Sequence, residues 1–286
     1  MQKCSILLAL FIFLFSLITG NVHAQLFPHD SPKANITQKV GFNEISISYS
    51  RPRVRGREIW DVLVPYGEVW RTGANYPTMI SFETETYIES KVLPAGKYAL
   101  YSIPNKSEWI IIFSKNTELW GAFGYEVDDD ALRVSVRPED TNWTESFTIE
   151  FSNVTTNSAN LNLRWANINV PIKIEVNTYK EFMSNTQNEL KKNEEQDWRF
   201  YWQAAKHLLE LKRDLDLAED WIRRSTKLEK NWMNLWTRAE LSAFNENFEE
   251  AVKFGKETFE ICKENTPYCA YVKVYEKQII QWSLKK

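Results

Sequence analysis

The sequence predicts an α+β protein. Its N-terminal part is expected to be an antiparallel β-sandwich or barrel that resembles a jelly roll, and its C-terminal part an all-α domain of tetratricopeptide-like helix hairpins. Apolar and polar residues alternate in short runs as far as residue 176. Apolar residues then recur at helical spacing, and an apolar segment stands at the N-terminus. We therefore expect a signal peptide at 1–24, a β domain at 25–176 and a helical domain at 177–286.

The first 24 residues have the features of a secretory signal peptide. Lys3 supplies the positive charge, residues 6–18 supply the apolar stretch, and residues 22–24 offer a cleavage site before Gln25. The alternative is a transmembrane anchor, but the apolar stretch is shorter than the roughly 20 residues that a spanning helix needs. We therefore expect an exported protein, periplasmic or secreted, with no membrane span after cleavage.

The β domain is indicated by short alternating runs that turn residues separate. These runs lie at 44–49, 78–83, 96–103, 108–113, 131–136, 146–151, 160–165 and 170–176. Such strands, with turn signals every 8–12 residues or so, are typical of antiparallel sandwiches and barrels. No long helical pattern interrupts them, which argues against a parallel sheet with crossover helices.

The helical domain contains a weak internal sequence repeat. Trp202 and Ala205 recur about 34 residues later as Trp236 and Ala239, the period of tetratricopeptide helix pairs. A plain helical bundle is the alternative. In either case stacked amphipathic helices would bury one continuous core, and a concave face could hold a protein partner.

Two cysteines remain after the signal peptide, Cys262 and Cys269. In an oxidising compartment an isolated pair often forms a disulfide. The residues between them, Lys-Glu-Asn-Thr-Pro-Tyr, end a helix and form a turn, so a disulfide there would fix a helix–helix corner. Two reduced, half-buried thiols are the alternative, because the sequence does not give the Cα separation that a disulfide needs.

The residue census limits the chemistry that the β domain can perform. Of the three histidines, His23 lies in the signal peptide, His29 lies near the mature N-terminus and His207 lies in the helical domain, so the β domain proper has no cysteine and no histidine beyond residue 29. A Ser-His-Asp triad, a Cys-His dyad or a multi-histidine zinc site therefore cannot form within the β domain. A net charge of −3 gives no general attraction to nucleic acid. We expect no cofactor, no metal and no nucleic acid, and we favour a protein that is not an enzyme.

One acidic cluster could contradict the expectation of no metal. Glu126, Asp128, Asp129 and Asp130 offer hard oxygen ligands that calcium prefers. Their spacing is not that of an EF-hand loop, and a solvated turn before the strand at 131–136 is the alternative. We favour the turn.

The strongest local constellation is basic and aromatic. Four arginines alternate between Arg51 and Arg57, and Trp70, Arg71 and Asn75 follow in a glycine-containing segment. Guanidinium groups bind carboxylate, sulfate or phosphate through two parallel hydrogen bonds, and tryptophan rings can line a sugar-binding surface. Our candidate ligand-binding site consists of Arg51, Arg57, Trp70, Arg71 and Asn75. The alternative is that the arginines pair with the domain's own acids and brace its loops.

Several motifs, in order along the chain, resemble the family known as domain of unknown function 2911. The motifs are Ser50-Arg-Pro with Gly56-Arg57, Val69-Trp-Arg-Thr-Gly-Ala-Asn75, Leu93-Pro-Ala-Gly-Lys-Tyr98, Trp109, Trp120-Gly121 and Leu132-Arg133. The resemblance covers roughly residues 30–176 and implies an exported bacterial protein, chiefly of the Bacteroidetes group, in which a helical tail is familiar. It implies no substrate and no catalytic residue. Where the family usually has an acid after the asparagine, this chain has Tyr76 and Pro77.

These observations favour a non-catalytic binding and scaffold protein. The β domain would hold a small polar or anionic ligand or an envelope glycan, and the helical tail would hold a protein partner. One alternative is a hydrolase or lyase that acts on envelope carbohydrate through two carboxylates. A second alternative is a structural domain that only displays the helical tail.

Overall fold

The computed structural model describes residues 28–193, 196–264 and 272–285, so the predicted signal peptide at 1–24 lies outside the described residues. The chain divides into two compact units between Asn177 and Thr178. We call them the β unit and the helical unit. None of the described helices is both long and apolar enough to cross a membrane. The α+β fold class predicted from the sequence is confirmed.

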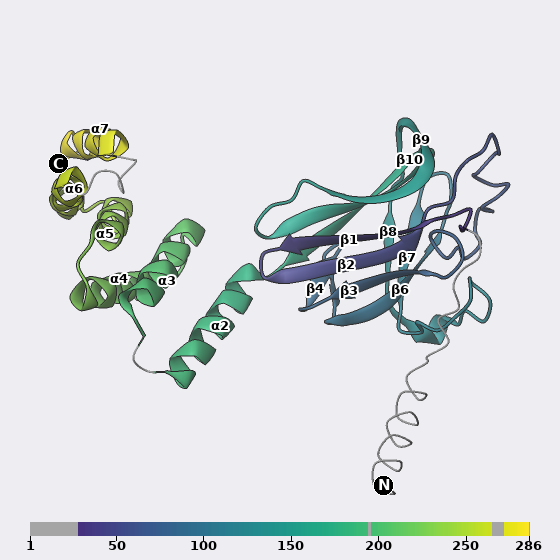
Figure 1. Ribbon diagram of the computed structural model, residues 1–286, viewed down its shortest axis with the longest axis horizontal. Coiled ribbons are helices and arrows are strands. Elements are labelled where there is room, and N and C mark those ends of the chain that lie inside the picture. The colour runs from purple at the N-terminus through teal and green to yellow at the C-terminus, as the bar shows by residue number, and fades with distance from the viewer. Residues whose placement is uncertain (1–27, 194–195, 265–271, 286) are drawn as a thin grey trace, which may run out of the picture. The chain divides into compact units, whose positions relative to one another are not determined.

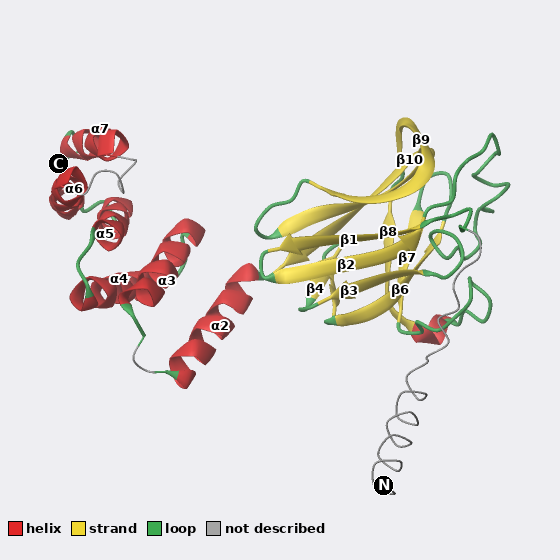
Figure 2. Ribbon diagram, viewed as in Figure 1, coloured by secondary structure: helices red, strands yellow, loops and turns green. Residues whose placement is uncertain are grey.

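The β unit consists of two antiparallel sheets (Figures 1 and 2). The first has the order β1 (Lys33–Val40), β2 (Asn43–Ser50), β3 (Thr78–Phe82), β6 (Gly96–Ile103), β7 (Trp109–Ser114), β8 (Asp130–Val136). The second has the order β5 (Lys91–Leu93), β4 (Thr86–Ile88), β10 (Ser158–Val176), β9 (Glu139–Ser152). Sequence neighbours thus pair in both sheets, except that the short β4–β5 hairpin leaves the first sheet and joins the second.

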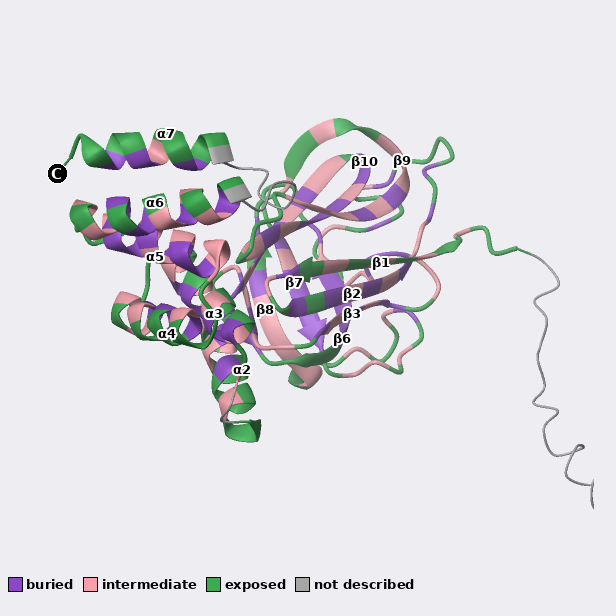
Figure 3. Ribbon diagram, turned by 60° about the vertical axis from the view of Figure 1, so that its left-hand side comes forward, coloured by how far each residue is buried: buried purple, intermediate pink, exposed green. Residues whose placement is uncertain are grey.

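Alternation along the strands places one face of each sheet in a shared core. In β2, Ile45, Ile47 and Tyr49 are buried, whereas the residues between them are exposed or half-buried. They belong to one core cluster with Phe147 of β9 and Trp165 of β10, which lie in the other sheet. Figure 3 shows buried segments along the strands of both sheets. The two sheets therefore form a sandwich, and burial of this apolar face is the main term that stabilises it.

The C-terminal part of the β unit corrects one detail of the prediction. The runs at 160–165 and 170–176 are not separate strands but parts of β10, which continues through Pro171. Pairing with β9 ends at Asn169, and pairing with β4 begins at Ile174. Pro171 has no N–H to donate and lies where the strand changes partner, so the strand tolerates it there.

A buried tyrosine links the two sheets by hydrogen bonds. The Tyr49 hydroxyl donates to the Ile149 carbonyl at 3.3 Å and accepts from the Ile149 N–H at 3.1 Å. We expect Tyr49→Phe to lower the free energy of unfolding by about 1–3 kcal/mol, because both backbone groups of Ile149 would lose a partner inside the core. Urea denaturation of the mature chain measures this change.

The control for this prediction is Tyr66→Phe. The Tyr66 hydroxyl has no hydrogen bond within the described part of the chain, so its loss should change stability little. Equal stability of Tyr49→Phe and the unsubstituted protein would show that this link between the sheets contributes nothing.

The helical unit is a series of consecutive helices (Figure 1). They are α2 (Thr178–Lys192), α3 (Trp198–Leu211), α4 (Leu215–Leu228), α5 (Trp232–Phe244), α6 (Phe248–Glu264) and α7 (Val272–Ser283). Helix α3 packs against α4, α5 packs against α6, and α6 packs against α7. The repeated alanines have equivalent surroundings, because Ala205 in α3 and Ala239 in α5 are both buried, each in a hydrophobic cluster of the helical unit.

The predicted disulfide falls partly outside the described residues. Cys262 in α6 is fully buried and disulfide-bonded. Its predicted partner Cys269 lies outside the described residues, so the pairing itself stays a prediction. Cys262 packs in a small cluster with Tyr275 of α7.

Candidate functional site

A cavity of about 520 Å³ opens at one end of the sandwich, and we call it the loop-end cavity. Its walls come mainly from the long connection between β2 and β3, with one residue from the β7–β8 connection; both connections lie at the same end in Figure 2. The lining residues are Ser31, Pro52, Arg57, Leu63, Val64, Pro65, Glu68, Val69, Trp70, Arg71, Gly73, Ala74, Phe123 and Trp165. Three of the five predicted ligand-binding residues are among them: Arg57, Trp70 and Arg71.

A cluster of aromatic rings forms the base of this cavity. Trp70 stacks on Trp165 with ring centroids 5.8 Å apart and an interplanar angle of 14°. Trp60, Trp109 and Phe147 meet Trp70 edge-on at 5.3–6.2 Å. Such edge-to-face contacts are favourable beyond the area they bury. Much of the tryptophan content thus serves as a rigid core, and two of the rings also face the cavity.

Trp70 and Arg71 are held in place by the turn that contains them. The backbone of Trp70 forms two hydrogen bonds with Ser102 of β6, at 2.8 and 2.9 Å. Thr72 has a φ of 51°, which is costly for a β-branched residue. Its hydroxyl lies 2.9 Å from that of Ser102, and its carbonyl accepts from the Thr78 hydroxyl at 2.6 Å. These bonds stabilise a strained turn and fix the direction of Arg71.

Arg71 has unused hydrogen-bonding capacity. Its Nε is shielded from solvent and has no hydrogen-bond partner in the described part of the chain, and the same is true of Nε1 of Trp165. The Nη1 atom of Arg71 lies 2.9 Å from the position that a Cβ on Gly121 would occupy, so the glycine makes room for the guanidinium. A shielded N–H without an acceptor costs free energy unless a ligand supplies one.

The other two cationic candidates mainly bind the protein's own backbone. Arg51 donates from Nε to the Phe147 carbonyl at 3.1 Å and from Nη2 to the Thr148 hydroxyl at 2.8 Å, which ties the end of β2 to β9. Arg57 lines the cavity but donates from Nε to the Val54 carbonyl at 3.0 Å. Neither they nor Arg71 form a salt bridge among the described residues, so the alternative of acid-paired arginines does not apply to these three.

Acids pair instead with the two intervening arginines. Arg53 lies 3.7 Å from Glu145, and Arg55 lies 3.2 Å from Asp30. The hydrogen bond from Arg55 lowers the pKa of the Asp30 carboxyl. These pairs are exposed and contribute little to stability. Of the four alternating arginines, Arg53 and Arg55 therefore form solvent-exposed ion pairs. Arg51 and Arg57 instead bind the loops by hydrogen bonds, and Arg57 also lines the cavity.

Asn75 does not line the cavity but connects segments behind its wall by hydrogen bonds. Its Nδ2 donates to the Ser31 carbonyl and to the Ser50 hydroxyl, both at 3.3 Å. Its φ of 62° is a conformation that asparagine adopts more readily than most residues. The amide thus connects the N-terminal segment to the end of β2 behind the turn.

The sequence did not single out several residues of the site. Trp165 was hidden in the regular alternation of a predicted strand, and Glu68 looked like an ordinary loop acid. Phe123 lies between Gly121 and Gly124 in the sequence, and an aromatic residue between two glycines was a usable signal for the rim of a site. In the structure it is 78% exposed. Tyr76 and Trp120 are also exposed, and their rings meet edge-on at 4.6 Å.

Two of the four acids considered for calcium, Asp129 and Asp130, bind side chains of the β unit itself. Asp130 accepts from the Tyr125 hydroxyl at 2.8 Å and pairs with Arg133, and Asp129 accepts from Asn116 at 2.9 Å. Burial raises the pKa of the Tyr125 hydroxyl, and the hydrogen bond from Arg133 lowers it in part. Within the described residues no group of three or more His, Cys, Asp or Glu is placed to hold a metal ion.

The fold and the cavity together define a two-part protein, with a β-sandwich that has a hollow at its loop end and a chain of helix hairpins. Residues 31–174 match the family described as "Protein of unknown function (DUF2911)". The chain belongs to this family. No curated protein and no solved structure matches the chain.

Four of the motifs that carry the family resemblance meet at the loop-end cavity, whereas Leu93–Tyr98 and Leu132-Arg133 are not among its lining residues. Trp70, Arg71 and Gly73 line it, and Trp109 packs into its aromatic base. Gly121, from a distant motif, lies beside Arg71. These four motifs are therefore parts of one three-dimensional site, although they are spread along the domain.

Proposed function

We propose that the β unit binds a small ligand rich in hydrogen-bond acceptors, such as an anion or an acidic or polyhydroxylated sugar, in the loop-end cavity. The chain works as a non-catalytic binding and scaffold protein. The observation that carries this proposal is Arg71, which lines the cavity while its Nε has no acceptor within the described part of the chain. A carboxylate, sulfate or sugar hydroxyl supplies the missing acceptor.

The composition of the wall supports a ligand that accepts hydrogen bonds and stacks on rings. Two arginines, Arg57 and Arg71, face one acid, Glu68, so the ionisable side chains of the described wall carry a net positive charge. The rings of Trp70 and Trp165 supply an apolar surface against which a sugar face can pack. A two-carboxylate hydrolase needs a second acid roughly 5–10 Å from the first, and Glu68 is the one acid among the described lining residues.

We also propose that the protein acts outside the cytosol, after removal of the signal peptide at 1–24, and that the helical unit holds a protein partner. The support for export is the charged start, short apolar stretch and small-residue cleavage site of the N-terminus. The support for the partner is the stacked helix-hairpin architecture, since such arrays commonly present extended binding faces.

A thermal-shift screen of the mature chain tests the ligand proposal. The probes are glucuronate, inorganic sulfate and the neutral disaccharide cellobiose. We expect at least one acceptor-rich probe to raise the melting temperature in a concentration-dependent way, and we expect Arg71→Ala to abolish the shift. A shift that survives Arg71→Ala, or no shift with any probe, contradicts the proposal.

A glycine substitution tests the site without changing any charge. In Gly121→Ala the new Cβ would lie 2.9 Å from Nη1 of Arg71, so the guanidinium must move. We expect the affinity for the active probe to fall about tenfold, the loss of roughly one well-formed hydrogen bond to a charged group. Isothermal titration calorimetry measures this change.

The matched control is Gly124→Ala in the same loop. Gly124 also has positive φ, 75° against 68° for Gly121, so both substitutions carry a similar backbone cost. The nearest described atom to its new Cβ is Cδ2 of Leu119 at 3.6 Å, an ordinary contact. Equal loss of affinity in both variants would show that loop strain, rather than displacement of Arg71, is responsible.

A further inference from the structure

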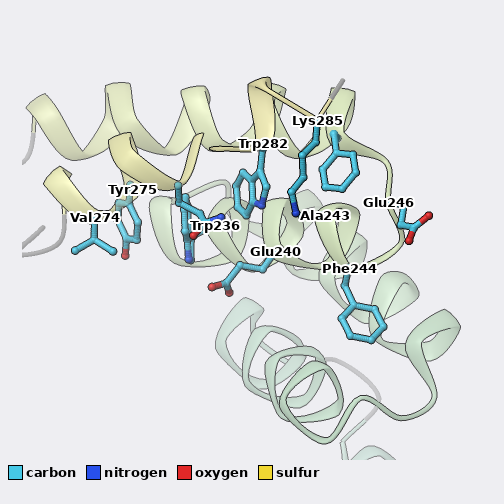
Figure 4. A pocket seen from close by; sticks show the side chains of 11 residues that line it. Trp236, Glu240, Ala243, Phe244, Glu246, Val274, Tyr275, Trp282 and Lys285 are labelled. Carbon is cyan, nitrogen blue, oxygen red and sulfur yellow. The ribbon is translucent and has the colours of Figure 1, made fainter. Parts of the chain in front are cut away.

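The helical unit contains two neighbouring hollows of about 580 and 290 Å³. Both are lined by Trp236, Glu240 and Tyr275, so the two hollows adjoin, and together we call them the helical groove. Figure 4 shows the larger hollow, with Glu240 next to Trp236. The larger hollow is lined chiefly by α5 and α7, and the smaller one by α3 and α5 with Tyr275 of α7. Stacked helix hairpins commonly present such extended faces to partners.

The walls of the helical groove are aromatic. The Trp236 ring contacts those of Tyr275 and Trp282 at centroid distances of 4.1 and 5.3 Å, with the ring planes tilted by 35° and 30°. Trp202 and Trp232 line the smaller hollow. Trp202 is fixed by a hydrogen bond from its Nε1 to the Thr237 hydroxyl at 3.0 Å. Rings held in this way lose little entropy when a ligand binds and present faces and edges that attract cations.

Glu240 is the acid that both hollows share, whereas Lys206 lines the smaller hollow, and Glu246 and Lys285 line the larger one. It is half-buried and forms no salt bridge within residues 28–193, 196–264 and 272–285. Burial raises the pKa of its carboxyl, while a hydrogen bond from Trp236 and the charge of Lys206 on α3 lower it in part. The Lys206 ammonium itself lies 3.8 Å from Glu210. The Glu240 carboxylate is therefore partly desolvated and has no direct cationic partner there.

We propose that the helical groove binds an extended basic peptide segment of a partner protein and that Glu240 pairs with a lysine or arginine side chain among the aromatic rings. A carboxylate beside tryptophan and tyrosine rings is complementary in charge to an ammonium or guanidinium group. A groove with two adjoining hollows holds several residues of an extended chain rather than a single side chain. The proposal rests on the protein partner proposed above and specifies its chemistry.

Titration calorimetry of the full mature chain with tetralysine tests this proposal. We expect Glu240→Gln to weaken tetralysine binding about tenfold, because a partly desolvated cation would lose its counter-charge. The substitution keeps the side-chain shape and removes a charge that burial disfavours, so the fold should tolerate it. Glu249→Gln, at an exposed position in the first turn of α6, makes the same change in net charge and should bind as the unsubstituted chain does.

Further probes and one further variant test which chemical group the helical groove binds. Tetralysine acetylated on every side-chain amine should not bind, and lysine amide alone should bind at least about tenfold more weakly than tetralysine because it fills one hollow. Arg71→Ala should bind tetralysine normally, so failure of the cavity proposal and failure of the groove proposal are distinguishable. Equal binding by Glu240→Gln and Glu249→Gln, undetectable binding of tetralysine, or equal affinity for lysine amide would each overturn the inference.

Discussion

Truncation of Trp165 to alanine is expected to lower the free energy of unfolding of the β unit by about 3–5 kcal/mol, the usual cost of removing a buried tryptophan. Trp165 is 2% exposed, stacks on Trp70 at 5.8 Å and contacts Phe147 at 6.0 Å. Its removal would open a large void at the base of the loop-end cavity, where neighbouring rings are held by several partners and cannot collapse fully.

Guanidinium denaturation followed by near-ultraviolet circular dichroism measures this loss, because the signal reports the aromatic cluster. Trp143→Ala is the matched control, since Trp143 lies on β9 and is 62% exposed. We expect the control to change stability by less than about 1 kcal/mol. Similar losses in both variants would mean that the clustered rings do not stabilise the β unit more than an isolated surface ring does.

The second large effect is expected on ligand affinity. Arg71→Ala should weaken binding of the active acceptor-rich probe by about 10- to 100-fold, as removal of hydrogen bonds from a charged donor usually does. Arg71→Lys should recover only part of the affinity, because an ammonium cannot reproduce the planar fork of a guanidinium. Titration calorimetry provides the dissociation constants.

Arg53→Ala is the control for this second prediction. Arg53 is exposed, pairs with Glu145 and does not line the cavity. This substitution removes the same charge from the same connection between β2 and β3, so it should leave affinity within about twofold. If Arg53→Ala were as damaging as Arg71→Ala, general attraction by positive charge would explain the binding, and a built site would not be needed.

The fold class and most strands follow from local patterns. Strict alternation along β2 is a direct consequence of a strand with one buried face, and the sequence therefore predicts it well. The strand β10 was harder to predict because Pro171 reads as a break. Only the tertiary structure shows that the strand exchanges β9 for β4 near this residue. The β4–β5 hairpin has strands of three residues each, too short to give a periodic signal.

The candidate site was predictable in residue type but not in the use of each residue. Arg51 and Arg71 look alike in sequence. The Arg51 guanidinium donates hydrogen bonds to Phe147 and Thr148, whereas Nε of Arg71 has no hydrogen-bond partner among the described residues. The difference depends on strands almost 100 positions away, which no local pattern encodes. The same is true of Gly121, whose closeness to Arg71 depends on the meeting of two loops.

The most direct test of the account is a crystal structure of the mature chain soaked with the probe that gives the largest thermal shift. We predict density for one probe molecule in the loop-end cavity, with an oxygen atom within hydrogen-bond distance of the Arg71 guanidinium and the probe packed against Trp70. A clearly bound probe elsewhere on the β unit, with the cavity empty and Arg71 unchanged, would contradict it.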